Sequence, residues 1–149
     1  MKQRYIPTAL IAVLTGGALM AADLESWRAA PSGPVPASEV DLAAFRWEAR
    51  PIVVMADAPD DPAFEEQLAK LSAASDEVAE RDILIVIDSD PSVGTALRGR
   101  LEARGFGVYL IGKDGGLKFS SETPVEMAEF NRIIDSMPMR AQEMRAAEN

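Results

Sequence analysis

The sequence predicts an α/β fold with a mixed sheet of about four strands and flanking helices. Two continuous apolar runs, residues 51–56 and 82–88, have the length and composition of buried parallel strands. Residues 106–120 have the pattern of an antiparallel hairpin, because two short β-forming runs flank a turn that contains Asp114-Gly115. Helical patterns follow each of the first two runs, so we expect parallel pairs before the hairpin and one antiparallel pair at it.

The segment between the two apolar runs has the pattern of an amphipathic helix. Asp61 stands at a natural N-cap position, and Pro62 follows at the first helical position, where its missing N–H is not needed. One face of this segment is apolar, and it carries Phe64, Leu68, Leu71 and Val78. Strand, helix and strand then form a unit in which parallel pairing is expected.

Two further helices are predicted later in the chain. Asp90 and Pro91 repeat the cap and proline signature, and this helix is expected to continue until Gly105. After the hairpin, Thr123 and Glu126 have the spacing of a capping box. The apolar face that follows carries Met127, Phe130, Ile134 and Met137, and we expect Phe130 and Leu110 to lie in the core.

The N-terminal residues have the pattern of a secretory signal peptide. Lys2 and Arg4 precede a mainly apolar run at 6–20, which is followed by two alanines. The run is shorter than the ~20 apolar residues of a membrane span, so we expect cleavage after residue 22 and no membrane insertion afterwards. The predicted location is therefore periplasmic or secreted.

Composition divides the remaining chain into three parts. Residues 23–39 are rich in Ala, Pro, Ser and Gly, and they are predicted to form a flexible linker. Residues 40–138 contain the strand and helix patterns and are predicted to form the folded domain. Residues 139–149 are charged and alanine-rich without a long apolar stripe, which favours a C-terminal tail or a helix extension.

The composition excludes several classes of function. The chain contains no cysteine and no histidine, which removes thiol redox chemistry, Cys- or His-based acyl transfer and the usual zinc and haem sites. Its formal net charge is −9, and loss of the signal peptide would make it more negative. An acidic chain is repelled by phosphate backbones and anionic lipids, so we expect no nucleic-acid partner.

The predicted order of elements, β-α-β-α-β-β-α, resembles the thioredoxin core. Three short segments, RWEARPIVV, IGKDGG and MPMRAQEM, resemble a bacterial family of exported domains of unknown function. That family is akin to the DUDES domains of animal extracellular proteins such as the sushi-repeat-containing protein SRPX. The likeness runs from about Asp41 to Arg145. It implies a thioredoxin-like scaffold without an established activity, and a fold alone does not supply a reaction.

The thioredoxin resemblance also shows what this chain lacks. A thioredoxin carries its Cys-x-x-Cys motif where the first strand gives way to the first helix, and here that position reads Asp60-Asp61-Pro62-Ala63. The threonine and cysteine of a peroxiredoxin are missing as well. A thiol oxidoreductase or peroxidase is therefore excluded.

Acidic residues follow both predicted parallel strands and form a candidate acidic edge. Asp57, Asp60 and Asp61 come after the first strand, and Asp88 and Asp90 come after the second. Both sets are expected at the carboxyl edge of the sheet, where α/β folds bind ligands. One hypothesis is a site for a hard cation such as calcium. The favoured hypothesis is that two of these residues are N-caps and the others are solvated loop acids, because no calcium-loop spacing is present.

Arg46, Trp47 and Arg50 form a candidate interaction site at the start of the first strand. Tryptophan with flanking arginines is enriched at binding hot spots, although a tryptophan beside a strand is more often packed against the rim of the fold. Lys113 and its neighbouring glycines lack a Walker pattern, and a hairpin turn explains them.

Together these observations favour an exported, non-redox, thioredoxin-like domain that acts as a protein-binding or structural module. The alternative is an enzyme or metal-binding protein that uses Asp57, Asp60, Asp88 and Asp90. No catalytic residue, metal ligand set or cofactor is predicted, and the expected partner is another protein.

Overall fold

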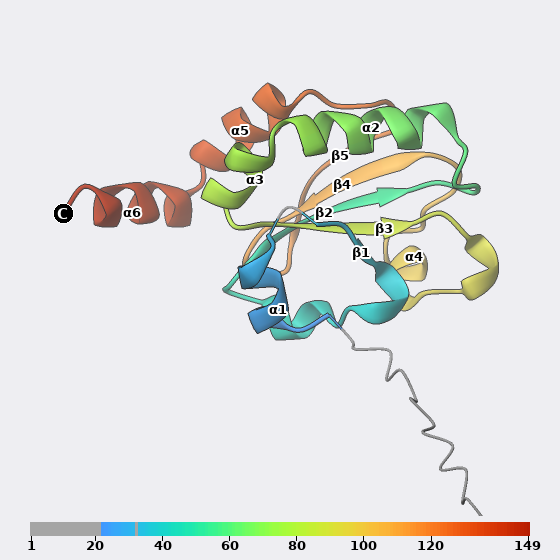
Figure 1. The fold of residues 1–149 in the computed structure, drawn as a ribbon, viewed down its shortest axis with the longest axis horizontal. Helices are drawn as coiled ribbons and strands as arrows, with labels where there is room; N and C mark the ends of the chain where they lie inside the picture. The colour runs from blue at the N-terminus through green and yellow to red at the C-terminus, as the bar shows by residue number, and fades with distance from the viewer. Residues whose placement is uncertain (1–21, 32) are drawn as a thin grey trace, which may run out of the picture.

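The computed structural model describes residues 22–31 and 33–149, and it shows a mixed five-stranded sheet with helices on both faces (Figure 1). The strands are β1 (Val35–Pro36), β2 (Arg50–Met55), β3 (Ile83–Asp88), β4 (Gly107–Ile111) and β5 (Leu117–Ser121). Their order across the sheet is β1-β3-β2-β4-β5. This architecture confirms the predicted α/β class and is consistent with a thioredoxin-like arrangement. Residues 1–21 of the predicted signal peptide lie outside the described residues.

The strand pairing agrees with the sequence analysis in part. Strands β2 and β3 are parallel, and β4 and β5 form the predicted antiparallel hairpin. The prediction of one antiparallel pair was wrong, because β4 also runs antiparallel to β2, with Gly107 opposite Met55. The connection from β3 to β4 contains two short helices, η3 (Pro91–Val93) and α4 (Ala96–Arg100). Strand β4 therefore starts at the same end of the sheet at which β3 finishes, and the chain does not return to the other end before β4 begins.

Residues 23–31 and 33–39, which the sequence predicts as parts of a flexible linker, form helices and a strand in the structure. They contain α1 (Leu24–Ala29), β1 and η1 (Ala37–Glu39), and β1 pairs in parallel with β3. Trp27 of α1 is buried, and its ring lies edge-on to that of Phe45 with 5.9 Å between the centroids. The prolines of this segment suggested a loop, but a very short edge strand tolerates proline because one of its sides has no neighbouring strand.

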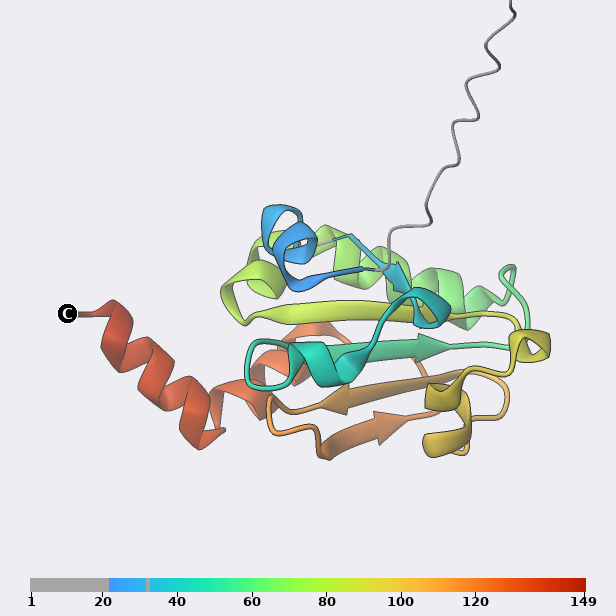
Figure 2. The same ribbon diagram turned by 90° about the horizontal axis from the view of Figure 1, so that it is seen from below.

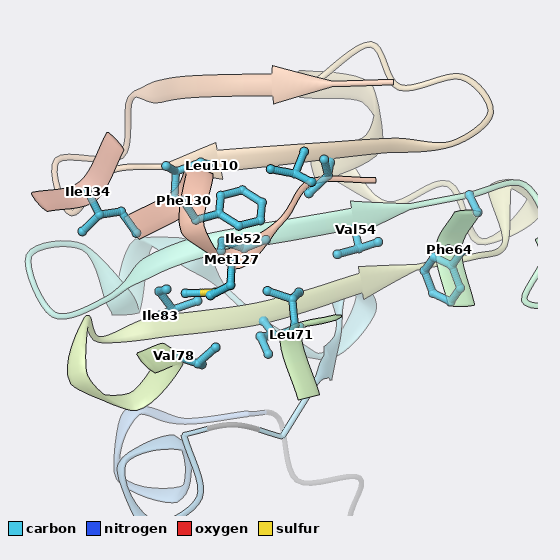
Figure 3. Packing of buried hydrophobic residues seen from close by; sticks show 14 residues of the cluster. Ile52, Val54, Phe64, Leu71, Val78, Ile83, Leu110, Met127, Phe130 and Ile134 are labelled. Carbon is cyan, nitrogen blue, oxygen red and sulfur yellow. The ribbon is translucent and has the colours of Figure 1, made fainter. Parts of the chain in front are cut away.

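The larger hydrophobic core lies between the sheet and α2 (Pro62–Ala73), α3 (Ser75–Glu80) and α5 (Met127–Asp135). The sequence predicts one helix where α2 and α3 follow each other. Figure 3 shows Phe130 of α5 and Leu110 of β4 among the side chains of this core. Both side chains are fully buried, which confirms their prediction as core residues.

A second hydrophobic cluster covers the opposite face of the sheet. It includes side chains of α1, α4 and the short helix η2 (Leu42–Phe45). Val53 of β2 belongs to this cluster, whereas its neighbours Ile52 and Val54 belong to the larger core. Successive side chains of a strand point to opposite faces, so a sheet covered on both faces needs continuous apolar runs.

The helix predicted from Asp90 to Gly105 is shorter in the structure. Gly94 has a φ of +62° and ends η3, and α4 then begins with Thr95 as its N-cap. In one continuous helix Val93 would lie on the same apolar face as Leu97, four residues later, but in the structure it is 56% exposed. The left-handed backbone of Gly94 therefore interrupts the apolar spacing that suggested one continuous helix.

The start of α5 also differs from its prediction. The helix begins at Met127, and Thr123 and Glu126 do not form the predicted capping box. Val125 is buried instead, and its N–H donates to Gln67 Oε1 at 2.7 Å while its carbonyl accepts from Gln67 Nε2 at 3.1 Å. The amide of Gln67 therefore bonds to both backbone groups of Val125, as a neighbouring strand would. The next residue, Glu126, has an extended backbone, and the helix starts only after it.

The last helix, α6 (Pro138–Ala147), projects away from the sheet (Figure 2). It covers most of residues 139–149, for which the sequence predicted either a tail or a helix extension. Extended backbone at Met137 separates it from α5, and Pro138 stands in its first turn. None of the helices in the described part of the chain is long and apolar enough to cross a membrane.

Candidate functional site

Arg98 lies between two carboxylates of the predicted acidic edge. Its guanidinium donates to Asp88 Oδ1 at 2.8 Å and to Asp88 Oδ2 at 3.3 Å. It also donates to Asp57 Oδ1 at 3.3 Å and to the carbonyl oxygen of Ala56 at 2.7 Å. The structure thus brings Asp57 and Asp88 together, as predicted for the ends of β2 and β3. The guanidinium group of Arg98 forms ion pairs with both carboxylates.

The pair of Asp88 and Arg98 is buried and fully hydrogen-bonded. Burial alone would raise the pKa of Asp88, but hydrogen bonds from Arg98 and from the hydroxyl of Thr95 outweigh it and lower the pKa below its usual value. The same contact with Asp88 raises the pKa of Arg98. The carboxylate therefore stays charged well into the acid range, and it positions Arg98 instead of acting as a proton donor or acceptor.

Two other residues of the acidic edge are caps, as the favoured hypothesis predicts, but its assignment of the remaining acids to solvated loops is wrong for Asp88, which is buried at the end of β3. Asp61 accepts from the N–H groups of Ala63 and Phe64 at the start of α2. Asp90 accepts from the N–H of Ser92 at 2.9 Å and caps η3. Asp60 is exposed. Among residues 22–31 and 33–149, no group of three or more acidic side chains has an arrangement that could hold a metal ion.

The cap at Asp61 gives a direct test of this interpretation. Asp61→Ala is expected to lower the free energy of unfolding by about 1 kcal/mol, because two backbone donors of α2 lose their acceptor. Asp60→Ala is the matched control on the neighbouring residue and should change stability by less than about 0.5 kcal/mol. Denaturant titration of both variants measures the difference. If both substitutions lowered the free energy of unfolding equally, the assignment of Asp61 as the cap of α2 would be wrong.

Arg46 and Trp47 form an exposed pair just before β2. Trp47 is 54% exposed, and the guanidinium carbon of Arg46 lies 5.3 Å from the centroid of its ring. Trp47 also has a φ of +70°, and its N–H donates to the carbonyl oxygen of Lys113 at 2.7 Å. A positive φ is unfavourable for a bulky residue. The hydrogen bond to Lys113 therefore holds the backbone of Trp47 in a strained conformation, with the indole at the surface. The alternative that Trp47 packs against the rim does not describe this geometry.

A cleft of about 470 Å³ lies beside Arg46, between η2 and the turn of the β4–β5 hairpin. Its apolar lining includes Phe45, Pro51 and Ile111. Arg46 and Arg100 are exposed basic residues of the same lining, and Arg100 donates to the carbonyl oxygen of Gly115 in the turn. The cleft therefore combines an apolar floor with two exposed cations and one exposed carboxylate, that of Asp114, on a chain whose net charge is −9. We refer to Arg46, Trp47 and this cleft as the Trp47 surface.

Arg50, the third residue of the candidate interaction site, does not belong to this surface. Its side chain is 1% exposed, and it donates two hydrogen bonds to Glu143 of α6, at 3.0 and 3.1 Å. It also donates to the carbonyl oxygen of Arg81 at 2.9 Å. The prediction that Arg50 contributes to an exposed site is therefore corrected, because β2 directs it into a buried ion network.

The sequence analysis missed three charged residues that the structure places at the centre of contacts, namely Arg98, Lys113 and Glu143. A charged residue next to a run of buried residues needs a partner, so the apolar residues beside Arg50 and Lys113 were a signal. The partners could not be identified from that signal, because Arg50 and Glu143 are 93 residues apart in the sequence.

The comparison with known families covers most of the folded region but not α1, β1 and η1. The family described as a domain of unknown function, DUF4174, matches residues 41–143. The matched residues include the Trp47 surface, Arg98 and four of the five strands. The match covers more than half of the sequence. The chain therefore belongs to the DUF4174 family.

Proposed function

We propose that this chain is an exported protein-binding module without thiol redox activity, and that the Trp47 surface is its contact site. The observation that carries the proposal is the strained, half-exposed indole of Trp47. A tryptophan in this position gains little from burial, yet its backbone occupies an unfavourable conformation. Strained residues of this kind concentrate at binding sites, where pre-organisation lowers the entropic cost of association.

The chemistry of the surface supports a protein partner. Tryptophan and arginine are the residue types most enriched among binding hot spots, and the contact with Arg46 restricts the indole before a partner arrives. The apolar floor of the cleft suits an apolar side chain, and Arg46 and Arg100 suit carboxylates beside it. The acidity of the rest of the chain makes a nucleic-acid partner unfavourable.

Export is the second part of the proposal, and it is based on the charged, apolar and small-residue order of residues 1–22. Removal of these residues would leave a periplasmic or secreted domain that is not inserted in a membrane. The relation to the DUDES domains of animal extracellular proteins is likewise proposed on the sequence resemblance. The alternative of an enzyme or metal protein at the acidic edge has less support, because Arg98 already engages Asp57 and Asp88.

The binding proposal predicts that Trp47→Ala abolishes a contact without unfolding the domain. A photo-crosslinking residue in place of Ala43, which is exposed and lines the cleft, should give a discrete protein adduct in the envelope of the producing cells. Trp47→Ala in this background should reduce the adduct at least 10-fold. The free energy of unfolding should change by less than about 0.5 kcal/mol, because the indole is a surface group.

Two controls make this experiment specific. A crosslinking residue at Glu65, which is exposed on α2, should not give the same adduct. Leu117→Ala removes another large apolar side chain, 51% exposed on β5, and should leave the adduct at Ala43 unchanged. An adduct that persists in Trp47→Ala would refute the assignment of the Trp47 surface.

A further inference from the structure

Two buried cations, Arg50 and Lys113, share the carboxylate of Glu143 where α6 meets the sheet, and Lys113 Nζ also donates to Asp82 Oδ2 at 2.8 Å. Glu143 of α6 accepts from both terminal nitrogens of Arg50 at 3.0 and 3.1 Å, and from Lys113 Nζ at 2.7 Å. The side chains of Arg50 and Lys113 are 1% and 8% exposed, whereas that of Glu143 is 26% exposed. The two cations are therefore buried in the body of the domain, and the carboxylate of Glu143 reaches them from the more exposed side.

Arg50 and Lys113 stabilise the charged form of Glu143. Burial alone would raise the pKa of Glu143, but the hydrogen bonds from Arg50 and Lys113 outweigh it and lower the pKa. Arg50 has no carboxylate partner other than Glu143 within the described residues, and its Nε atom is buried without a hydrogen-bond partner there. Loss of Glu143 would leave a buried guanidinium without a counter-charge, which is costly.

Helix α6 is attached to the domain mainly by polar contacts. Of the residues of α6, all of which the structure describes, Arg140 alone is buried. Arg140 donates to Glu80 at 2.8 Å and to Asp135 at 3.2 Å, so the second attachment is also ionic. The helix otherwise projects from the body, as Figure 2 shows. A helix held by ion pairs, and not by a packed apolar face, can be displaced by a competing carboxylate.

Lys113 belongs both to the site that binds Glu143 and to the surroundings of Trp47. The side chain of Lys113 donates to Glu143, and its backbone carbonyl accepts the N–H of Trp47 at 2.7 Å. Trp47 and Glu143 therefore contact the same residue, one through its backbone and the other through its side chain.

We propose that Arg50 and Lys113 form a carboxylate-binding site, which α6 fills with its own Glu143 until an acidic segment of the partner protein takes its place. The identity of the ligand as an acidic segment rests on the proposed function, whereas the carboxylate site itself does not. Glu143 is then an intramolecular ligand, and α6 competes with the partner for one site.

Chemical rescue tests the site on the purified full-length protein. Glu143→Ala removes the carboxylate, and a small carboxylate is expected to replace it. Sodium acetate should raise the melting temperature of Glu143→Ala by about 3–5 °C more than sodium chloride of equal ionic strength, and the rise should saturate. The unsubstituted protein should show no difference between the two salts, because Glu143 already occupies its site.

Further variants make the rescue decisive. Glu148→Ala, on an exposed residue at the end of the same helix, should respond equally to both salts. Lys113→Met combined with Glu143→Ala should lose most of the acetate effect. If Glu143→Ala does not fold in chloride, refolding in acetate replaces melting as the measurement. An equal response of Glu143→Ala to acetate and chloride in either assay would overturn the carboxylate site.

The crosslinking assay at Ala43 then tests the competition. Glu143→Ala should increase the yield of the partner adduct several-fold, because the site no longer contains its internal ligand, and Glu148→Ala should not. An unchanged yield with a positive acetate rescue would refute displacement by the partner. If no adduct forms in any variant, the proposed binding function fails, while the acetate result still decides whether the carboxylate site exists.

Discussion

Replacement of Phe130 by alanine is expected to lower the free energy of unfolding by about 3–5 kcal/mol. The ring is fully buried in the larger core, and it lies edge-on to that of Phe119 with 6.2 Å between the centroids. Removing it loses the transfer free energy of the ring and leaves a cavity between α5 and the sheet. Because small domains are stable by only about 5–15 kcal/mol, the loss should be visible in a single urea titration.

Leu117→Ala provides the comparison for Phe130→Ala. Leu117 is also a large apolar residue, but it is 51% exposed on the edge strand β5, so its loss should change stability by less than about 0.5 kcal/mol. If the two variants unfolded at similar urea concentrations, the description of α5 as packed against the sheet through Phe130 would be wrong.

Replacement of Arg98 by methionine is expected to cost a further large amount, about 3–5 kcal/mol. The substitution keeps much of the volume of the side chain but leaves the Asp88 carboxylate buried without its counter-charge. It also removes the donor to the carbonyl oxygen of Ala56. The cost arises from this uncompensated charge, so it should be largest near neutral pH, where Asp88 is ionised.

A second variant separates this cause from a general effect of substitution in the segment. Asp88→Asn combined with Arg98→Met removes both charges, and it should be more stable than Arg98→Met alone by about 1–2 kcal/mol. Arg104→Met, at an exposed arginine in the same connection, should change stability by less than about 0.5 kcal/mol. A double variant no more stable than Arg98→Met would show that the charge of Asp88 does not cause the loss.

The parts of the fold that depend on local pattern could be predicted from the sequence. The apolar runs of β2 and β3, the hairpin around Asp114-Gly115 and the cap at Asp61 each have a signal within a few neighbouring residues. The start of α5 could not be predicted in this way. It depends on Gln67, 58 residues away from Val125, which binds a backbone that the local sequence would otherwise assign to a helix.

The candidate sites show the same division. Arg46 and Trp47 are neighbours in the sequence, so their association was visible before the structure. Proximity in the sequence also grouped Arg50 with them, and this was wrong because Arg50 belongs to β2, whose side chains are buried on both faces of the sheet. The contacts of Arg98 with Asp57 span 41 residues, and no local pattern records them. Sequence reasoning therefore found surface features built from neighbours and missed buried ion pairs built from distant residues.

The short strand β1 has a consequence for the order in which the molecule assembles. It precedes β2 in the chain, yet its partner in the described sheet is β3, so a long loop must close before the two can meet. A strand of two residues offers few hydrogen bonds to offset that loss of entropy. We therefore expect the central strands to form first and to present β3 as a template. Strand β1, although it precedes the other strands in the chain, is then expected to be among the last to pair.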